Sequence, residues 1–315
     1  MSEILEVTDL RKSYKEKEAV KGINFEVHAG EILCILGPNG AGKSTTINML
    51  TGALHPNGGR IVSALTQGQE IHSQLKAFKR ELGIVPQDLA IYEDLSAEDN
   101  VQFFASLYGL RGKELKERCV YALSFVGLLD HADEKAKTFS GGMKRRLNIA
   151  CAIAHKPSLL IMDEPTVGID PQSRNHILES IKRLRDEGMT IIYTTHYMEE
   201  VEEISTRIII VDHGEIIAMG TKESLKADIE SEKIVLVEGE GVERLDFQVV
   251  TAVKGVTDVE LADGVLRVVS LRDEENLDDI IAALLEQKVK ISNIQSQAVS
   301  LETVFLNLTG RTLRD

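Results

Sequence analysis

A glycine-rich segment that ends in a lysine and a serine carries the clearest chemistry in this sequence. Residues 37–44 read GPNGAGKS and fill every fixed position of the pattern GxxxxGK(S/T). Glycines let the backbone wrap closely around an anion, and a helix that follows turns its positive end towards the same point. Lys43 can reach the β- and γ-phosphates of a nucleotide, and the Ser44 hydroxyl can bind Mg²⁺. The predicted binding residues are Gly37, Asn39, Gly40, Ala41, Gly42, Lys43, Ser44 and Thr45.

A second signal is a pair of carboxylates at the end of an apolar run. Residues 159–162 read LLIM, and Asp163 and Glu164 follow directly. Ligands of open α/β sheets bind beyond the carboxyl ends of the strands, so both carboxylates are expected near the phosphates. We predict that Asp163 holds Mg²⁺ through water and that Glu164 polarises an attacking water as general base. An isolated Asp-Glu pair is more often a solvated turn, but its pairing with the phosphate loop favours the catalytic interpretation.

Strands and helices must position these residues, and the apolar pattern predicts where they lie. Residues 4–10 and 22–27 nearly alternate apolar with polar positions, which indicates half-buried antiparallel strands. Residues 31–36 are almost all apolar, as in a strand covered on both faces, and a helix is expected to start near Lys43. Further buried strands are expected at 159–162, 190–195 and 207–211, a helix at 174–186, and mostly helical structure at 88–156. This βαβ rhythm predicts an α/β fold with a parallel sheet between helices.

The composition changes near residue 228, which indicates a second domain. Residues 232–315 contain 16 acidic and 9 basic residues and therefore carry half of the net charge of −14. The expected order is strand 233–237, helix 242–253, strand 257–261, a turn at Asp263-Gly264, strand 265–270, helix 277–287, strand 290–297 and an amphipathic helix at 300–308. The βαββαβ part of this order predicts a small α+β, ferredoxin-like unit. We therefore expect one domain at 1–229 and an accessory domain at 230–315.

Composition excludes several classes of protein. A chain of 315 residues is long enough for about two domains with cores of their own. The acidic balance, the absence of Trp and only 4% aromatic residues argue against a dedicated nucleic-acid binder. The three cysteines lie far apart without a CxxC pair, which favours a reducing cytosol over a disulfide framework. The apolar runs are too short to cross a membrane, and the polar start does not read as a signal peptide.

A third motif makes a family resemblance specific. Residues 139–143 read FSGGM, and Ser140 precedes Asp163 by 23 positions. With the motifs above, the chain resembles the ATP-binding cassette (ABC) ATPases, and this segment is similar to their signature sequence. The resemblance implies that two cassettes dimerise head to tail and that Ser140, Gly141 and Gly142 close over the ATP of the partner. Phe139 and Met143 depart from the usual Leu and Gln of the signature. The plainer interpretation of the segment is a helix cap by Ser140.

Four more residues take their predicted roles from the resemblance. Gln87 matches the family's Q-loop, which senses Mg²⁺ and water, and His196 matches the switch histidine that contacts the γ-phosphate. Asp170 lies in a segment similar to the D-loop, which carries contacts across the dimer. Tyr14 stands where the family stacks an aromatic ring on adenine. Taken singly, each has a plainer interpretation: a turn residue, a helix cap before Pro171, or a tyrosine at a strand edge.

The resemblance covers residues 1 to about 229 and implies the architecture of a cassette. That architecture is a RecA-like P-loop core, an N-terminal antiparallel β-subdomain and a helical subdomain at about 88–156. Since Glu164 and His196 are both present, the resemblance implies a cassette that hydrolyses ATP with Mg²⁺. Residues 95–100, 139–147, 167–171 and 301–311 resemble bacterial exporters of drugs, antibiotics, sodium or glycans.

In that branch the permease is a separate chain. The resemblance therefore implies a homodimer, or a heterodimer with a related cassette, docked on a permease at the cytoplasmic face of the membrane. Residues 97–108 would contribute to the groove that receives a coupling helix. The alternative is a soluble ABC ATPase in DNA repair or translation, although its relatives carry two cassettes or long coiled coils. The C-terminal domain is either an appendage that stabilises the dimer, which we favour, or a regulatory module.

Overall fold

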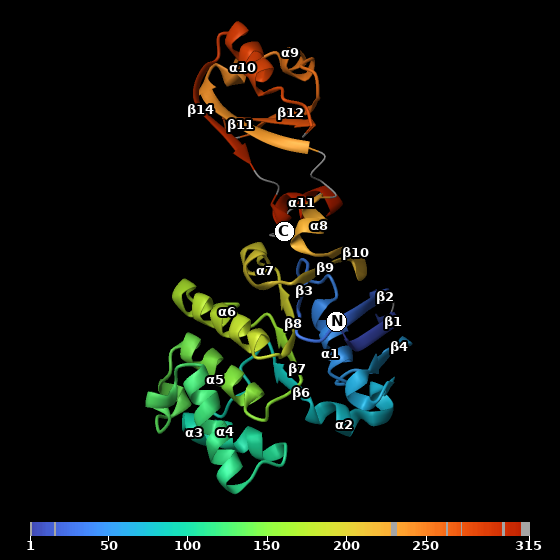
Figure 1. Ribbon diagram of the computed structural model, residues 1–315, viewed down its shortest axis with the longest axis vertical. Coiled ribbons are helices and arrows are strands. Elements are labelled where there is room, and N and C mark those ends of the chain that lie inside the picture. The colour runs from blue at the N-terminus through green and yellow to red at the C-terminus, as the bar shows by residue number, and fades with distance from the viewer. Residues whose placement is uncertain are drawn as a thin grey trace. The chain divides into compact units, whose positions relative to one another are not determined.

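Two compact units make up the protein, and they divide between Lys222 and Glu223 (Figure 1). The computed structural model describes residues 2–15, 17–227, 232–262, 264–271, 273–297 and 300–309. Each unit has its own sheet structure and its own cluster of buried apolar side chains. The limits expected at residues 229 and 230 fall within a segment, 228–231, that lies outside the described residues, so those limits stay a prediction.

A six-stranded sheet forms the centre of the first unit. Its strands, in spatial order, are β10 (Glu215–Gly220), β9 (Arg207–Asp212), β3 (Ile32–Leu36), β8 (Thr190–Thr195), β7 (Leu159–Asp163) and β6 (Leu82–Val85). All neighbouring pairs are parallel except β10 with β9. Every residue of β3 and β8 is buried, which confirms the buried strands expected from the sequence. The sequence analysis did not predict β6 and β10, which are short or only partly buried.

An antiparallel sheet lies beside the central one. Its order is β2 (Lys17–His28), β1 (Glu3–Tyr14), β4 (Gly58–Ser63) and β5 (Gln69–Glu70). The main core of the unit joins the two sheets, because Leu5 and Val7 of β1 and Leu33 and Ile35 of β3 belong to one buried cluster. The two antiparallel strands expected from alternation are therefore confirmed, and both are longer than the pattern indicated.

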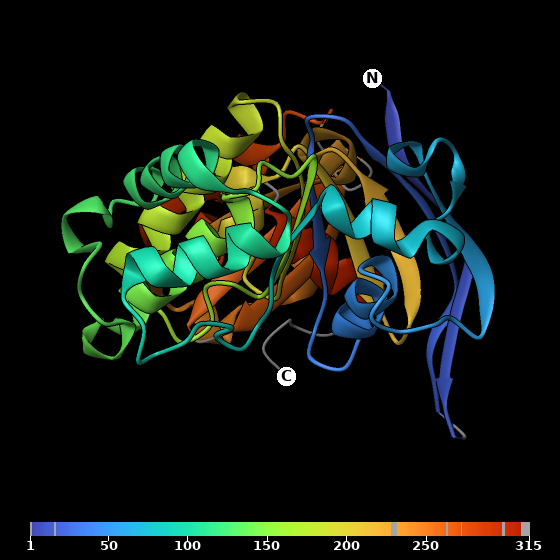
Figure 2. The same ribbon diagram turned by 90° about the horizontal axis from the view of Figure 1, so that it is seen from below.

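Three of the helices of the first unit form a group of their own. The helices are α1 (Lys43–Leu50), α2 (Leu75–Arg80), α3 (Ala97–Leu107), α4 (Gly112–Phe125), α5 (Gly141–Ile153), α6 (Pro171–Asp186) and α7 (Met198–Ile204). Helices α3, α4 and α5 form the expected helical region, and Figure 2 shows them on the opposite side of the unit from the strands of the antiparallel sheet. Within the part of the chain that the structure describes, no helix combines the length and apolar character needed to cross a membrane.

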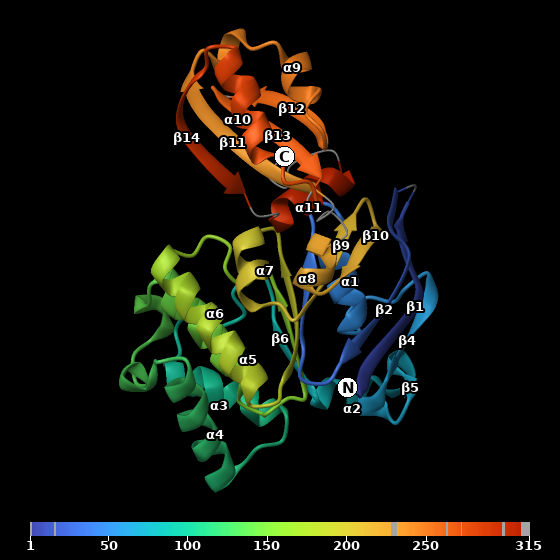
Figure 3. The same ribbon diagram turned by 45° about the horizontal axis from the view of Figure 1, so that its top comes forward.

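The second unit contains a four-stranded antiparallel sheet in the order β12-β13-β11-β14. Its elements are β11 (Glu232–Glu240), α9 (Phe247–Thr251), β12 (Val256–Ala262), β13 (Val265–Leu271), α10 (Leu277–Glu286) and β14 (Lys290–Gln297). Helices α9 and α10 cover the same face of this sheet (Figure 3). The predicted βαββαβ, ferredoxin-like order is confirmed. Two further helices, α8 (Lys222–Ala227) and α11 (Leu301–Thr309), flank this sheet in the chain.

Two details of the second unit differ from the sequence expectation. The helix expected over 242–253 is a 3₁₀ turn, Val242–Arg244, followed by the short α9. The interruption arises because Leu245 is extended and the side chain of Asp246 accepts a hydrogen bond from the backbone of Gln248, which starts a new helix. The turn expected at Asp263-Gly264 includes Asp263, which lies outside the described residues.

We predict that the second unit depends on its own core. Leu266 of β13 is fully buried in that core, whereas Leu271 of the same strand is 42% exposed. Leu266→Ala should destabilise the second unit by about 2–4 kcal/mol, because it leaves a cavity. Leu271→Ala is the matched control and should cost far less. Hydrogen exchange of β11 to β14 measures both, and equal protection in the two variants would contradict the prediction.

Candidate nucleotide site

The loop between β3 and α1 has a backbone that only glycine can form at two positions. A Cβ atom on Gly37 would lie 2.3 Å from the backbone oxygen of Val211, and one on Gly42 would lie 2.5 Å from that of Ala19. Gly42 also has a φ of 105° as the residue that precedes α1. The loop is therefore held tightly against β9 and β2, with the amino end of α1 behind it.

Lys43 lies beneath this loop, and its ammonium group contacts three oxygen atoms. Its side chain is 5% exposed, and Nζ donates hydrogen bonds to the backbone oxygens of Gly37 at 2.8 Å and Pro38 at 3.2 Å. The same Nζ lies 3.1 Å from Oε1 of Glu164. A buried ammonium needs such partners, because its desolvation is otherwise very costly. The predicted phosphate-binding lysine and the predicted general base are thus in direct contact.

Thr194 of β8 fixes the two carboxylates that follow β7. The backbone N–H of Glu164 donates to the backbone oxygen of Thr194 at 3.2 Å and to its hydroxyl at 3.0 Å. That hydroxyl donates in turn to Oδ1 of Asp163 at 2.6 Å. These bonds hold Glu164 at a φ of 45°, which is unusual for a residue with a side chain. No pattern in the sequence points to this role of Thr194.

His196 completes a cluster at the carboxyl end of the parallel strands. It follows β8 directly, and its Nδ1 lies 3.4 Å from Oε1 of Glu164. This nitrogen is buried but makes no hydrogen bond with any residue that the structure describes. Lys43, Glu164 and His196 therefore gather at one carboxylate, where ligands of open α/β sheets bind.

A pocket of about 310 Å³ opens over the loop. Its lining is Tyr14, Lys17, Ala19, Asn39, Gly40, Gly42, Lys43, Ser44, Thr45, Gln87 and Glu164. Most of the predicted nucleotide residues therefore meet in one place, although Gly37, Ala41, Asp163 and His196 are outside this lining. Lys17 and Ala19 were not predicted, because a residue at the start of a hairpin strand carries no recognisable pattern. Tyr14 is 49% exposed, so its ring is accessible for stacking on a planar ligand.

Arg145 connects the pocket to α5. Its guanidinium donates from Nη1 to the backbone oxygen of Pro86 at 2.8 Å and from Nη2 to that of Gln87 at 2.6 Å. The side chain is buried, and this burial lowers the pKa of Arg145. Gln87 is therefore positioned by a residue to which the sequence analysis gave no role.

The signature and D-loop residues lie together but outside the pocket. Ser140 caps α5 by accepting from the backbone N–H of Met143 at 3.2 Å, and Asp170 caps α6 by accepting from that of Ser173 at 2.9 Å. The bonds from Ser173 hold the pKa of Asp170 below its usual value. A Cβ on Gly142 would lie 2.2 Å from the Ser173 hydroxyl, so the two helix starts are in contact. Ser140, Gly141 and Asp170 are exposed and line no part of the nucleotide pocket.

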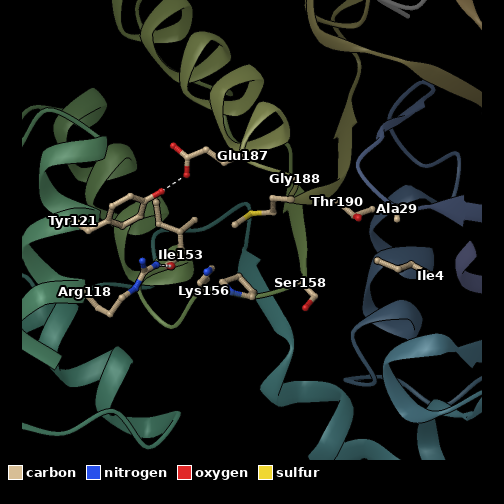
Figure 4. Close-up of a pocket in the computed structure, with 12 residues that line it drawn as sticks. Ile4, Ala29, Arg118, Tyr121, Ile153, Lys156, Ser158, Glu187, Gly188 and Thr190 are labelled. Atoms are coloured by element: carbon tan, nitrogen blue, oxygen red, sulfur yellow. Dashed lines mark hydrogen bonds between the residues drawn. The ribbon is translucent and has the colours of Figure 1, made fainter. Parts of the chain in front are cut away.

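Another pocket, of about 460 Å³, lies at the amino ends of the same strands (Figure 4). Ser158 precedes β7 and Thr190 begins β8, so this pocket is at the sheet edge away from the loop. Three of its polar side chains are engaged in hydrogen bonds: Tyr121 donates to Glu187, and Arg118 donates to the backbone oxygens of residues 153 and 154. Burial and Glu187 raise the pKa of Tyr121 to about 12. This pocket contains none of the predicted residues.

Comparison with known proteins places this geometry in a family. The profile described as ABC transporter matches residues 20–167, and that of the C-terminal domain of DrrA1-3-like ATP-binding proteins matches residues 220–309. The solved ATP-binding subunit of an ABC transporter superposes with a TM-score of 0.65 at 30% identity, over 72% of this chain and 93% of that one. A dimeric post-hydrolysis ATP-binding cassette bound to ADP and Pi gives 0.63 at 26% identity, over 69% and 98%.

Curated relatives extend over the whole chain. The linearmycin resistance ATP-binding protein LnrL of Bacillus subtilis is 44% identical and covers 99% of this chain and 100% of its own length. The daunorubicin/doxorubicin resistance ATP-binding protein DrrA of Streptomyces peucetius is 35% identical, over 99% and 94%. The Nod factor export ATP-binding protein I of Cupriavidus metallidurans is 36% identical, over 100% of both chains.

The chain belongs to the family of ABC transporter ATP-binding proteins. It is a nucleotide-binding ATPase subunit of the export class, and its α/β P-loop fold is that of an ABC cassette. Nothing in these comparisons supports the alternative of an ATPase in DNA repair or translation.

We predict that Arg145 holds the backbone at Pro86 and Gln87 in place. Arg145→Met keeps an unbranched side chain but removes the guanidinium, so two backbone oxygens lose their donors, which should cost about 2–3 kcal/mol of stability. Hydrogen exchange over residues 85–91 should rise. The matched control is Arg146→Met, since Arg146 donates instead to the backbone oxygens of Val126 and Gly127. If both variants loosen residues 85–91 equally, Arg145 has no special role there.

Proposed function

We propose that Glu164 is the general base for hydrolysis of ATP held over the loop between β3 and α1. The observation that carries this proposal is the contact of its carboxylate with both Lys43 and His196. Lys43 would bind the β- and γ-phosphates. These phosphates would compete with Glu164 for the positive charge of Lys43. Glu164 would then be available to polarise an attacking water, with His196 contacting the γ-phosphate. Gln87 would sense the water, and Tyr14 would stack on adenine.

Mg²⁺ fits the oxygen donors beside the loop. Ser44 offers a hydroxyl, Gln87 an amide oxygen and Asp163 a carboxylate that is already oriented by Thr194. Within the described residues there is no cluster of three His, Cys, Asp or Glu side chains that could hold a metal ion, so the protein would supply few ligands. Mg²⁺ commonly binds in this way, through one or two protein oxygens and the phosphates of its substrate. When bound, it would neutralise phosphate charge as the terminal phosphoryl group leaves.

The active form would be a head-to-tail dimer. Ser140, Gly141, Gly142 and Asp170 lie outside the nucleotide pocket of their own chain, which suits contacts to the ATP of a partner. The free N–H groups at the start of α5 favour an anion such as the γ-phosphate. The solved dimer of a similar cassette supports a dimeric form. The partner would be a second copy or a related cassette.

A separate permease would couple hydrolysis to export. A groove of about 600 Å³ runs between α2 and the end of α3, lined by Leu75, Lys76, Lys79, Arg80, Leu107 and Tyr108. Leu107 is exposed in it, which suits a docked coupling helix from the permease. The chain would thereby be held at the cytoplasmic face of the membrane. The names of its relatives support outward movement of an organic compound, such as an antibiotic.

Glu164→Gln tests the role of the base. The amide keeps the size of the side chain but cannot accept a proton, so hydrolysis should fall by about 10²–10⁴-fold while ATP binding persists. The variant should also accumulate as an ATP-bound dimer, measured by size-exclusion chromatography with light scattering. Glu179→Gln, an exposed position on α6, is the control. Unchanged turnover in Glu164→Gln would remove this residue from the role of base.

A membrane partner can be sought directly. Tagged Glu164→Gln chain, incubated with ATP and Mg²⁺, should retain a stoichiometric and strongly hydrophobic protein from detergent-solubilised membranes of the native cell. Lys43→Ala, which lacks the phosphate-binding ammonium, should retain less of it if closure on ATP strengthens docking. Recovery of soluble partners or nucleic acid alone would count against the transporter proposal.

A further inference from the structure

A buried carboxylate behind the nucleotide site has no place in the mechanism above. Glu200 of α7 is 1% exposed, and three hydroxyl groups surround it. It accepts hydrogen bonds from Thr166 at 2.5 Å, Thr195 at 2.7 Å and Tyr193 at 2.9 Å. So many donors offset the cost of burying a charge at this place. Tyr193 is itself buried beside Glu200, and this burial raises the pKa of Tyr193 far above the usual value, so that its hydroxyl remains a donor.

These bonds join the two segments that carry the reacting groups. Thr166 is two residues beyond Glu164, and Thr195 directly precedes His196. The Thr195 hydroxyl also accepts from the backbone N–H of Tyr197 at 3.0 Å, which closes the turn around His196. One carboxylate therefore holds both the loop after Glu164 and the turn that presents His196. The 3.4 Å separation of Glu164 and His196 depends on both segments.

A cation from α6 reaches the same place. Nε of Arg174 lies 3.6 Å from Oε1 of Glu200, and its guanidinium lies 4.9 Å from the centre of the Tyr197 ring. Nε of Arg174 is buried and has no hydrogen-bond partner among the described residues. Arg174 lies in the first turn of α6, and its backbone N–H donates to the backbone oxygen of Asp170 at 2.9 Å. The residue is thus one helical turn from the D-loop and in contact with the His196 turn.

We propose that Glu200 and Arg174 are positioning residues that set the geometry of Glu164 and His196. Glu200 fixes the two segments relative to each other. Arg174 transmits the position of the Asp170 segment to the His196 turn, through its contacts with Glu200 and Tyr197. Docking of a second cassette on Asp170 would thereby adjust the switch histidine of this one. The inference rests on the proposed function, because it assigns these residues to the hydrolysis of ATP.

The first test is Arg174→Ala in the full chain. Turnover of ATP should fall about tenfold while KM stays within about twofold, because a group that acts on the reacting geometry affects kcat and not substrate binding. Arg185→Ala is the matched control: it lies on the same helix, pairs with Asp186 and has a side chain 33% exposed against 29% for Arg174. The control should retain its turnover. An Arg174→Ala variant with normal kcat would overturn the role of Arg174.

The second test asks whether Arg174 acts through His196. In a chain that already carries His196→Ala, Arg174→Ala should have no further effect on kcat, since the residue it positions is gone. A full tenfold loss in that background would overturn the proposal, because a general structural defect adds to other defects. Failure of the proposed function would give a different result. In that case the unaltered chain would show no ATP hydrolysis that Glu164→Gln abolishes.

Glu200 has tests of its own. Glu200→Gln keeps the shape and removes the charge, and it should lower kcat several-fold. In the His196→Ala background the loss should be smaller but still measurable, because Glu200 also holds the loop after Glu164 through Thr166. Thr195→Val removes one hydroxyl at constant size and serves where Glu200→Gln does not fold. A folded Thr195→Val chain with unchanged kcat and KM would overturn the positioning role of the carboxylate.

Discussion

The buried ammonium of Lys43 is the interaction on which the rest of the site depends. It is held by two backbone oxygens of its own loop and by Glu164, so it ties the strand before the loop to the strand that ends in the acids. A charge at this depth is tolerated only because every partner is in place. The closely packed glycines, the left-handed backbone of Glu164 and its hydrogen bond to Thr194 all maintain that one arrangement. As a result, the conformation of the loop is preorganised to bind an anion.

Much of this could be predicted from the sequence because the decisive constraints are local. The phosphate loop depends on glycines whose absent side chains make room for backbone atoms, and a short pattern records such a requirement faithfully. Parallel strands other than β6 were recognisable because strands buried on both faces are mostly apolar. The ferredoxin-like order followed from the alternation of short strands with two helices.

The remainder depended on contacts between distant segments, which leave no spacing to recognise. Arg145 lies more than fifty positions from Gln87, and nothing in either segment reveals that a guanidinium of one holds the backbone of the other. Thr194 and Lys17 are ordinary residues until the fold brings them to the site. The helix expected over 242–253 was wrong because apolar spacing does not show where Asp246 caps a new helix.

The bonds of Arg145 have a consequence for a pair of cassettes. In a head-to-tail dimer, Gln87 would attend the ATP of its own chain, while the start of α5 would face the ATP of the other. A single guanidinium on α5 holds the backbone at Gln87, so the two segments are directly connected. A change at either nucleotide site would then be passed to the other through this contact. Cooperativity between the two ATP molecules would thus be built into each subunit before the subunits meet.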